Sequence, residues 1–231
     1  MTPLRTPRVA ALFCLLALAA ARPMPAGAAA QARTLAPTAD QVRQIVSRAS
    51  VRIEVEDAVM RGVCTGWIGW SEDARSAAYT AAHCFRAGAR YRLIVAGSDD
   101  VVYATNLTRW ESLDLMVLWF PRGGLPALRS WKPMPAGPFR AVYVLSARGA
   151  PLRLVDVAVP RVHWEIRFNT HPLAVAVPLM SVPGTSGAPV VDLRDGALVG
   201  MIVGFAVDRP ELAAVVPAQS IYDALVAASR P

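Results

Sequence analysis

The chain has 231 residues, of which 54% are hydrophobic and 18% are charged, and its formal net charge is +7. This length suits one large domain or two small ones, and the hydrophobic content excludes an intrinsically disordered chain. Beyond the N-terminal region no run of eighteen or more residues is apolar, so we expect no stable membrane span in the mature chain. No basic cluster is interleaved with aromatic residues, so we also expect no nucleic-acid partner.

The N-terminal segment has the features of a secretory signal peptide. Arg5 and Arg8 precede an apolar run from Val9 to Ala21, and alanine-rich sequence continues as far as Ala30. We therefore predict a signal peptide within residues 1–30, with cleavage either near Ala21 or around Ala28 to Ala30, and a secreted or periplasmic mature protein. Its removal takes away three arginines and no acidic residue, which lowers the net charge to +4.

Two helices are predicted, one at each end of the mature chain. Thr38 and Gln41 have the spacing of a capping box, and apolar residues follow at helical intervals, which predicts a short helix over 39–48. Near the C-terminus, Ile221 and Leu225 have helical spacing within "PAQSIYDALVAAS" and predict a terminal helix.

From Ser50 onward the sequence consists of short β-prone runs separated by Gly, Pro, Asp and Asn. This pattern is typical of an all-β sandwich or a pair of barrels. A proline-rich segment, residues 121–138, divides the mature chain nearly in half, and we expect the two parts to be 31–125 and 126–231. The β-prone runs are SVRIEVE, GVCTGWIGW, YRLIVAG, VVYATNL, DLMVLWF, AVYVLSA, LRLVDVAV, HWEIRF, APVVDL, ALVGMIVGFAV and LAAVVP.

Removal of the signal peptide leaves two cysteines, Cys64 and Cys84. An even number of cysteines in an exported protein suggests one disulfide. The alternative is a metal site, but two cysteines without a closely spaced pair of histidines supply too few ligands. We favour the disulfide, and we expect no metal and no cofactor.

Three separate stretches carry the residues needed for acyl transfer. His83 lies in "TAAHCF", Asp114 begins the apolar run "DLMVLWF", and Ser186 lies in the glycine-bounded turn "GTSG". A serine hydroxyl becomes a good nucleophile when an imidazole takes its proton, and a carboxylate orients that imidazole. The backbone N–H groups of Gly184 and Ser186 are candidates for stabilising the oxyanion.

The order of these residues excludes two other classes of serine hydrolase. An α/β-hydrolase has its histidine after the serine, and no histidine follows Ser186. A subtilisin-like enzyme would need its aspartate before His83 on an alternating α/β pattern, which the β-rich sequence does not have.

At these residues the chain resembles the chymotrypsin-like (trypsin-fold) serine peptidases. "TAAHC", "DLMVL" and "GTSGAP" are similar to that family's histidine, aspartate and nucleophile motifs, and Cys64 matches the half-cystine that pairs with the one beside the histidine. The resemblance covers about residues 45–228. It implies two antiparallel Greek-key β-barrels, with His83 and Asp114 on the first, Ser186 on the second, and the active site between them.

The spacings resemble the compact bacterial members of the family, including the HtrA-type peptidases. The interval from His83 to Asp114 and the interval from Asp114 to Ser186 are both short, and the ending "AAVVPAQSIYDAL" is also HtrA-like. The sequence ends there, so we expect no PDZ domain.

Several residues depart from the family pattern. Thr185 stands where zymogen-activated members have an aspartate, which argues against activation by a salt bridge to a new N-terminus. Met180 and Phe205 fall at positions that line the primary substrate pocket, which predicts that substrates with Arg or Lys are disfavoured. Val203 falls where a polar residue often supports the catalytic aspartate.

The leading functional prediction is a secreted or periplasmic serine endopeptidase that acts on protein or peptide substrates. The alternative is a catalytically silent binding protein on the same scaffold. The two other histidines, His163 and His171, are interpreted as structural or surface residues, and the sequence does not indicate an oligomeric state.

Overall fold

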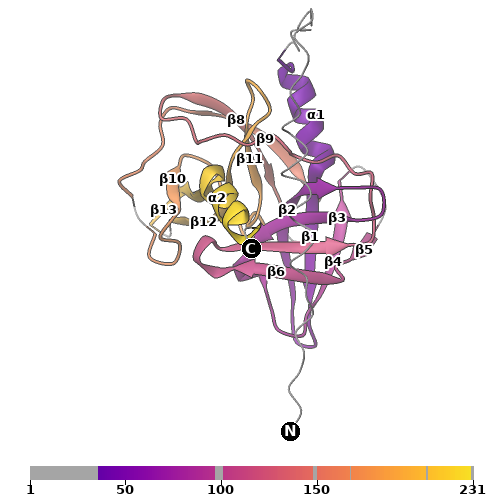
Figure 1. Cartoon of the computed structure of the whole chain (residues 1–231). Helices are drawn as coiled ribbons and strands as arrows, with labels where there is room; N and C mark the ends of the chain where they lie inside the picture. The colour runs from indigo at the N-terminus through magenta and orange to yellow at the C-terminus, as the bar shows by residue number, and fades with distance from the viewer. Residues whose placement is uncertain (1–35, 97–100, 148–149, 167, 207, 230–231) are drawn as a thin grey trace, which may run out of the picture.

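The structure is a computed structural model that describes residues 36–96, 101–147, 150–166, 168–206 and 208–229. The predicted signal peptide over 1–30 lies outside these residues. Two curled antiparallel sheets form most of the molecule, and a helix lies at each end of the described chain (Figure 1). This is the predicted trypsin-like architecture. Among the described residues, no helix has the length and apolar character needed to cross a membrane.

The first sheet is built from the N-terminal half of the described chain. Residues of β1 (Ser50–Glu56) and β4 (Arg90–Val95) alternate between buried and partly exposed, because one face of these strands packs on the core. The strands, in spatial order, are β5 (Val101–Tyr103), β4 (Arg90–Val95), β1 (Ser50–Glu56), β2 (Arg61–Ser71), β3 (Ser76–Ala81), β7 (Leu115–Phe120) and β6 (Asn106–Trp110).

The second sheet follows the proline-rich segment. Its central strands are β11, which is buried throughout, and β12, which is buried from residue 198 to residue 203, as expected from their continuous apolar sequence. The strands, in spatial order, are β10 (Val175–Val177), β13 (Arg209–Pro217), β12 (Leu198–Ala206), β11 (Pro189–Asp192), β8 (Phe139–Leu145) and β9 (Arg153–Val159).

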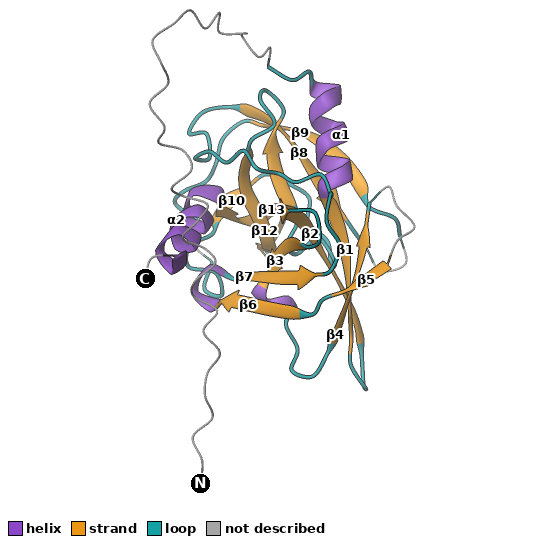
Figure 2. Cartoon of the chain, turned by 45° about the vertical axis from the view of Figure 1, so that its right-hand side comes forward, coloured by secondary structure: helices purple, strands orange, loops and turns teal. Residues whose placement is uncertain are grey.

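The two helices are purple in Figure 2. Helix α1 (Ala39–Ala49) begins at Thr38, where both hydrogen bonds of the predicted capping box are present, and buries Val42 and Val46. Helix α2 (Ala218–Ser229) follows β13 directly and packs on β12 and β13. Both predicted helices are confirmed.

One predicted strand is wrong. In the run HWEIRF, His163 and Phe168 form only isolated bridges, and the described residues between them belong to no named strand. The chain turns here, with Ile166 N donating to His163 O over 3.4 Å, and Trp164 is exposed. Apolar residues that turn out to solvent do not gain the two-sided packing that stabilises a strand.

Candidate active site

His83 lies at the end of β3, in the short 3-10 turn η2 (Ala82–Cys84). A disulfide joins Cys84 to Cys64 of β2, which confirms the predicted pairing and holds this turn against the neighbouring strand. The backbone of the turn is also fixed from the other side, because Ala82 N donates to Asp114 O over 2.9 Å. The His83 side chain is 43% exposed, so one edge of the imidazole faces solvent.

Asp114 lies between the 3-10 turn η3 (Glu111–Leu113) and β7, and it is 8% exposed. Its φ of 48° is the one positive value among non-glycine residues in the described chain. Such a conformation is uncommon and is tolerated best by Asp and Asn. Here it turns the carboxylate towards His83, at the end of the neighbouring strand β3.

The Asp114 carboxylate binds His83 through both of its oxygens. His83 N donates to Asp114 Oδ1 over 2.7 Å, and His83 Nδ1 lies 2.6 Å from Asp114 Oδ2. Because an ionised carboxylate can only accept, the Nδ1 atom carries the proton in this contact. The lone pair of the neutral imidazole is then on Nε2, which is the form required of a general base.

Ser186 lies in a loop of the second half of the chain that packs against the first sheet. Ser186 O accepts from Thr65 N over 2.8 Å, and Thr65 Oγ1 donates to Gly184 O over 2.8 Å. Gly187 has a φ of 87°, and a Cβ there would lie 2.1 Å from Thr65 O and 2.9 Å from Ala81 N. The loop therefore approaches the first sheet two residues before His83.

The predicted oxyanion donors are available in this loop. Gly184 has a φ of 106°, and within the described part of the chain neither Gly184 N nor Ser186 N has a hydrogen-bond acceptor. The Ser186 side chain likewise makes no hydrogen bond to His83 among these residues. The structure thus joins His83 to Asp114 directly, and it anchors the Ser186 loop on β2, the neighbour of the strand β3 that leads to His83.

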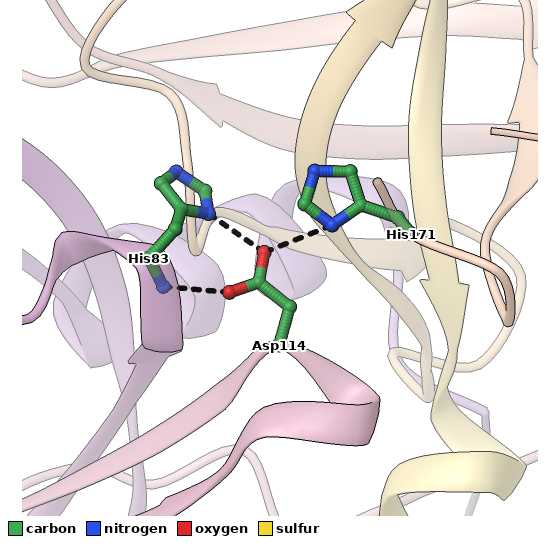
Figure 3. Close-up of side chains that lie close together, drawn as sticks. All are labelled: His83, Asp114 and His171. Atoms are coloured by element: carbon green, nitrogen blue, oxygen red, sulfur yellow. Dashed lines mark hydrogen bonds and ion pairs between the residues drawn. The ribbon is translucent and has the colours of Figure 1, made fainter. Parts of the chain in front are cut away.

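His171, interpreted from the sequence as a structural or surface residue, lies beside Asp114. Its Nδ1 is 3.3 Å from Asp114 Oδ2, and its ring centroid is 5.9 Å from that of His83 (Figure 3). Burial lowers the pKa of His171, and the charge of His83 lowers it further, whereas Asp114 opposes both effects. No motif surrounds His171 in the sequence, so only the tertiary structure reveals this contact.

These three side chains also form a group that could hold a metal ion, because their ligand atoms lie within 4.8 Å of one another. Two ligands of a tetrahedral zinc ion lie roughly 3.4 Å apart, given metal–ligand distances of about 2.1 Å. The 2.6 Å separation between His83 Nδ1 and Asp114 Oδ2 is much shorter. It fits a direct charge-assisted hydrogen bond rather than a shared metal ion.

The two residues predicted to line the substrate pocket are both at the surface. Met180 is 63% exposed and Phe205 is 39% exposed. Val203 is buried and aliphatic, so it offers no hydrogen bond to a carboxylate. The assignment of Met180 and Phe205 to a substrate pocket stays a prediction.

A family model for the trypsin-like peptidase domain matches residues 64–201, more than half of the chain. The active form of the Rv3671c protease from M. tuberculosis has a similar structure, with 20% identity, a TM-score of 0.68, and coverage of 89% of this chain and 93% of that chain. The serine endoprotease from Yersinia pestis is 14% identical with a TM-score of 0.68, over 84% of this chain and 67% of that chain.

The HtrA-type protease AlgW, solved with a decapeptide, also has 14% identity and a TM-score of 0.68, over 83% of this chain and 67% of its own. Structural likeness at such low identity shows the shared fold alone. The comparison with curated proteins found no match to this sequence.

Proposed function

This chain belongs to the trypsin-like peptidase domain family, and we propose that it is a secreted or periplasmic serine endopeptidase. The observation that carries the proposal is the hydrogen-bonded pair of His83 and Asp114, together with a loop in which Gly184 N and Ser186 N have no acceptor among the described residues. The disulfide supports export, because such bonds persist in oxidising compartments.

In the proposed mechanism Ser186 Oγ attacks the carbonyl carbon of the scissile peptide bond, while His83 Nε2 takes the hydroxyl proton. Asp114 keeps the proton of His83 on Nδ1 and stabilises the imidazolium that forms. The N–H groups of Gly184 and Ser186 donate to the developing oxyanion. His83 then returns its proton to the leaving amine, which departs and leaves an acyl group on Ser186.

Water completes the reaction. His83 removes a proton from the water molecule that attacks the acyl-enzyme, and the same proton then passes to Ser186 Oγ as the acid product leaves. The hydrogen bond between Ser186 and His83 forms in this proposal when substrate is seated, since catalytic hydrogen bonds are often long in free enzymes.

A fluorophosphonate probe tests the proposal, because it forms a covalent bond with an activated serine. We expect labelling of the folded wild-type protein and none of the Ser186→Ala variant. Ser181, five residues earlier in the same half of the chain, gives a control, and Ser181→Ala should still be labelled. Folded wild-type protein that stays unlabelled would instead support the silent binding protein.

We also propose that substrates with small or medium aliphatic residues before the cleaved bond are preferred. Met180 and Phe205 supply no carboxylate, and an unpaired Arg or Lys in an apolar pocket is strongly disfavoured. One additional methylene group discriminates by only about 1–3 kcal/mol, so the preference should be graded. A peptide-library cleavage profile measures it, and efficient cleavage after Arg that disappears in Ser186→Ala would contradict it.

A further inference from the structure

The Asp114 carboxylate lies between two imidazole rings from different parts of the fold. His83 approaches from the end of β3, whereas His171 approaches from the segment that leads into β10 of the second sheet (Figure 3). Both Nδ1 atoms point to the same oxygen, Asp114 Oδ2, at 2.6 and 3.3 Å. Asp114 is therefore a direct polar contact between the two halves of the molecule at the candidate active site.

The backbone holds His171 in this place. His171 N donates to Phe168 O over 3.1 Å, and Ala174 N donates to His171 O over 2.9 Å. The Nδ1 atom is buried and has no well-aligned hydrogen bond to any described residue, so the 3.3 Å contact with the Asp114 carboxylate is the polar interaction available to it. A small shift of the ring is enough to convert a 3.3 Å contact into an aligned hydrogen bond.

The protonation state of His171 follows from its surroundings. Burial and the nearby His83 lower its pKa, so the ring is neutral at neutral pH, and the adjacent carboxylate favours the tautomer with the proton on Nδ1. Among the described residues, the titratable groups that face His171 are Asp114 and His83. Glu111 lines the same small pocket but is paired with Arg109 over 2.8 Å, and Gly204 of β12, which adjoins the ring, carries no charge.

We propose that His171 is a positioning residue, which donates its Nδ1–H to Asp114 Oδ2 and so fixes the carboxylate that orients His83. This inference rests on the proposed peptidase function. Asp114 would then accept hydrogen bonds from His83 N, His83 Nδ1 and His171 Nδ1. A carboxylate held by three donors has less freedom to turn away as His83 gains a proton in the reaction.

Two variants of nearly equal shape separate the hydrogen bond from packing. In His171→Asn the amide nitrogen can occupy the place of Nδ1, whereas His171→Leu has the same branching without a donor. Both lose the same outer ring atoms next to Gly204. We expect His171→Leu to lower kcat by about ten- to a hundredfold with little change in KM, and His171→Asn to keep kcat within about threefold of wild type.

The pH profile gives a second kinetic readout. Without the donor, the negative charge of Asp114 is less compensated and favours the imidazolium form of His83. The acid limb of kcat/KM should therefore move to higher pH in His171→Leu and stay near its wild-type position in His171→Asn. Equal kinetics and pH profiles for the leucine variant and the wild type would overturn the proposal, as would equal losses in both variants.

A third measurement requires neither activity nor a substitution at His171. The chain has three histidines, so the imidazole nitrogens of Ser186→Ala protein can be assigned by NMR. We expect His171 to be neutral, with its proton on Nδ1. A proton on Nε2 of a neutral His171 would overturn the proposal. If folded wild-type protein is not labelled by a fluorophosphonate, the proposed peptidase function is wrong. The NMR spectrum still shows which nitrogen of His171 carries the proton, so the two proposals are tested separately.

Discussion

Asp114 combines an unusual backbone conformation with a buried charge, and both properties serve its contact with His83. A positive φ is costly for most residues, but both Asp and Asn tolerate it. The substitution Asp114→Asn therefore changes the chemistry of the side chain while it preserves the local fold.

We expect Asp114→Asn to lower kcat by roughly 10⁴-fold, with a smaller effect on KM. The amide can donate to His83 Nδ1 and so favour the tautomer with its proton on Nε2, which cannot accept the serine proton. Steady-state kinetics measures the loss, and thermal unfolding of the same sample checks the fold. A kcat within tenfold of wild type, in a folded variant, would show that Asp114 does not orient the base.

For single residues of the candidate site, the sequence predicts those that lie in short recognisable motifs, and it does not predict His171, which lies in none. His83, Asp114 and Ser186 each lie in a recognisable stretch, and the structure places His83 against Asp114 as the motifs predict. His171 has no such motif, and its role depends on a contact with Asp114, which lies far from it in the chain. Only tertiary packing can bring such residues together, so sequence patterns do not reveal them.

At the scale of elements, β2 supports the candidate site from two directions. Cys64 of this strand bonds to Cys84 in the turn of His83, and Thr65 beside it binds the Ser186 loop through its backbone and its hydroxyl. Adjacent residues of β2 therefore hold the His83 turn and the Ser186 loop, the two segments that must come together for catalysis. The capping box of α1 and the cysteine pair were predictable because they depend on local spacing or on a family motif, whereas the cross-sheet anchor at Thr65 was not.

We expect the double variant Cys64→Ala/Cys84→Ala to be less stable by about 3 kcal/mol, because the bond closes a long loop in the unfolded chain. Chemical denaturation of the variant and of oxidised wild type measures the difference. Since the bond also holds the His83 turn, fluorophosphonate labelling should slow even under conditions in which the variant is folded. Unchanged stability would mean that the disulfide contributes nothing to the fold.

A glycine pair tests how closely the Ser186 loop must approach β2. Gly187 and Gly124 both have positive φ, but a Cβ at Gly187 would lie 2.1 Å from Thr65 O, whereas one at Gly124 would meet nothing within 4 Å. Gly124→Ala should lower the free energy of unfolding by about 1 kcal/mol, which is the strain of placing alanine at a positive φ. Gly187→Ala should lower the free energy of unfolding by roughly 2–4 kcal/mol, because the clash of the new Cβ with Thr65 O adds to the same backbone strain.

The two glycine variants should also differ in activity. Displacement of the loop by Gly187→Ala should abolish labelling of Ser186, and Gly124→Ala should leave labelling unchanged. Denaturation midpoints and labelling rates for the two variants provide the comparison. Equal effects of both substitutions would show that the close contact with Thr65 is not needed.

At the scale of the whole molecule, the segment between the two sheets is tied to the second sheet by the chain's single lysine. Lys132 Nζ donates to Asp192 at the end of β11 over 2.8 Å and to Asp195 over 2.6 Å. Lys132 N also donates to Leu198 O at the start of β12. A proline-rich sequence predicts a connection here, but the charged contacts that fix its path depend on residues much later in the chain.

The two aspartates that share Lys132 give a matched test of this connection. Asp192 is fully buried and also binds Arg194, whereas the Asp195 side chain is 47% exposed. Burial alone would raise the pKa of Asp192, but the hydrogen bonds from Arg194 and Lys132 outweigh it, and the pKa lies below its ordinary value of 3.8. Asp192 therefore stabilises the fold fully above that pH, and this stabilisation is lost as the pH falls through the lowered pKa.

We expect Asp192→Asn to destabilise the protein by about 2–3 kcal/mol at neutral pH, because charged hydrogen bonds to a buried group are lost. The difference in the free energy of unfolding between wild type and Asp192→Asn should become smaller as the pH is lowered below 3.8, because wild-type Asp192 then begins to take up a proton. Asp195→Asn should cost at most about 1 kcal/mol, as is usual for an exposed ion pair. Urea denaturation of the three proteins at neutral pH and at about pH 2 measures these differences. A gap between Asp192→Asn and wild type that does not change with pH would show that the charge of Asp192 is not what holds the connecting segment in place.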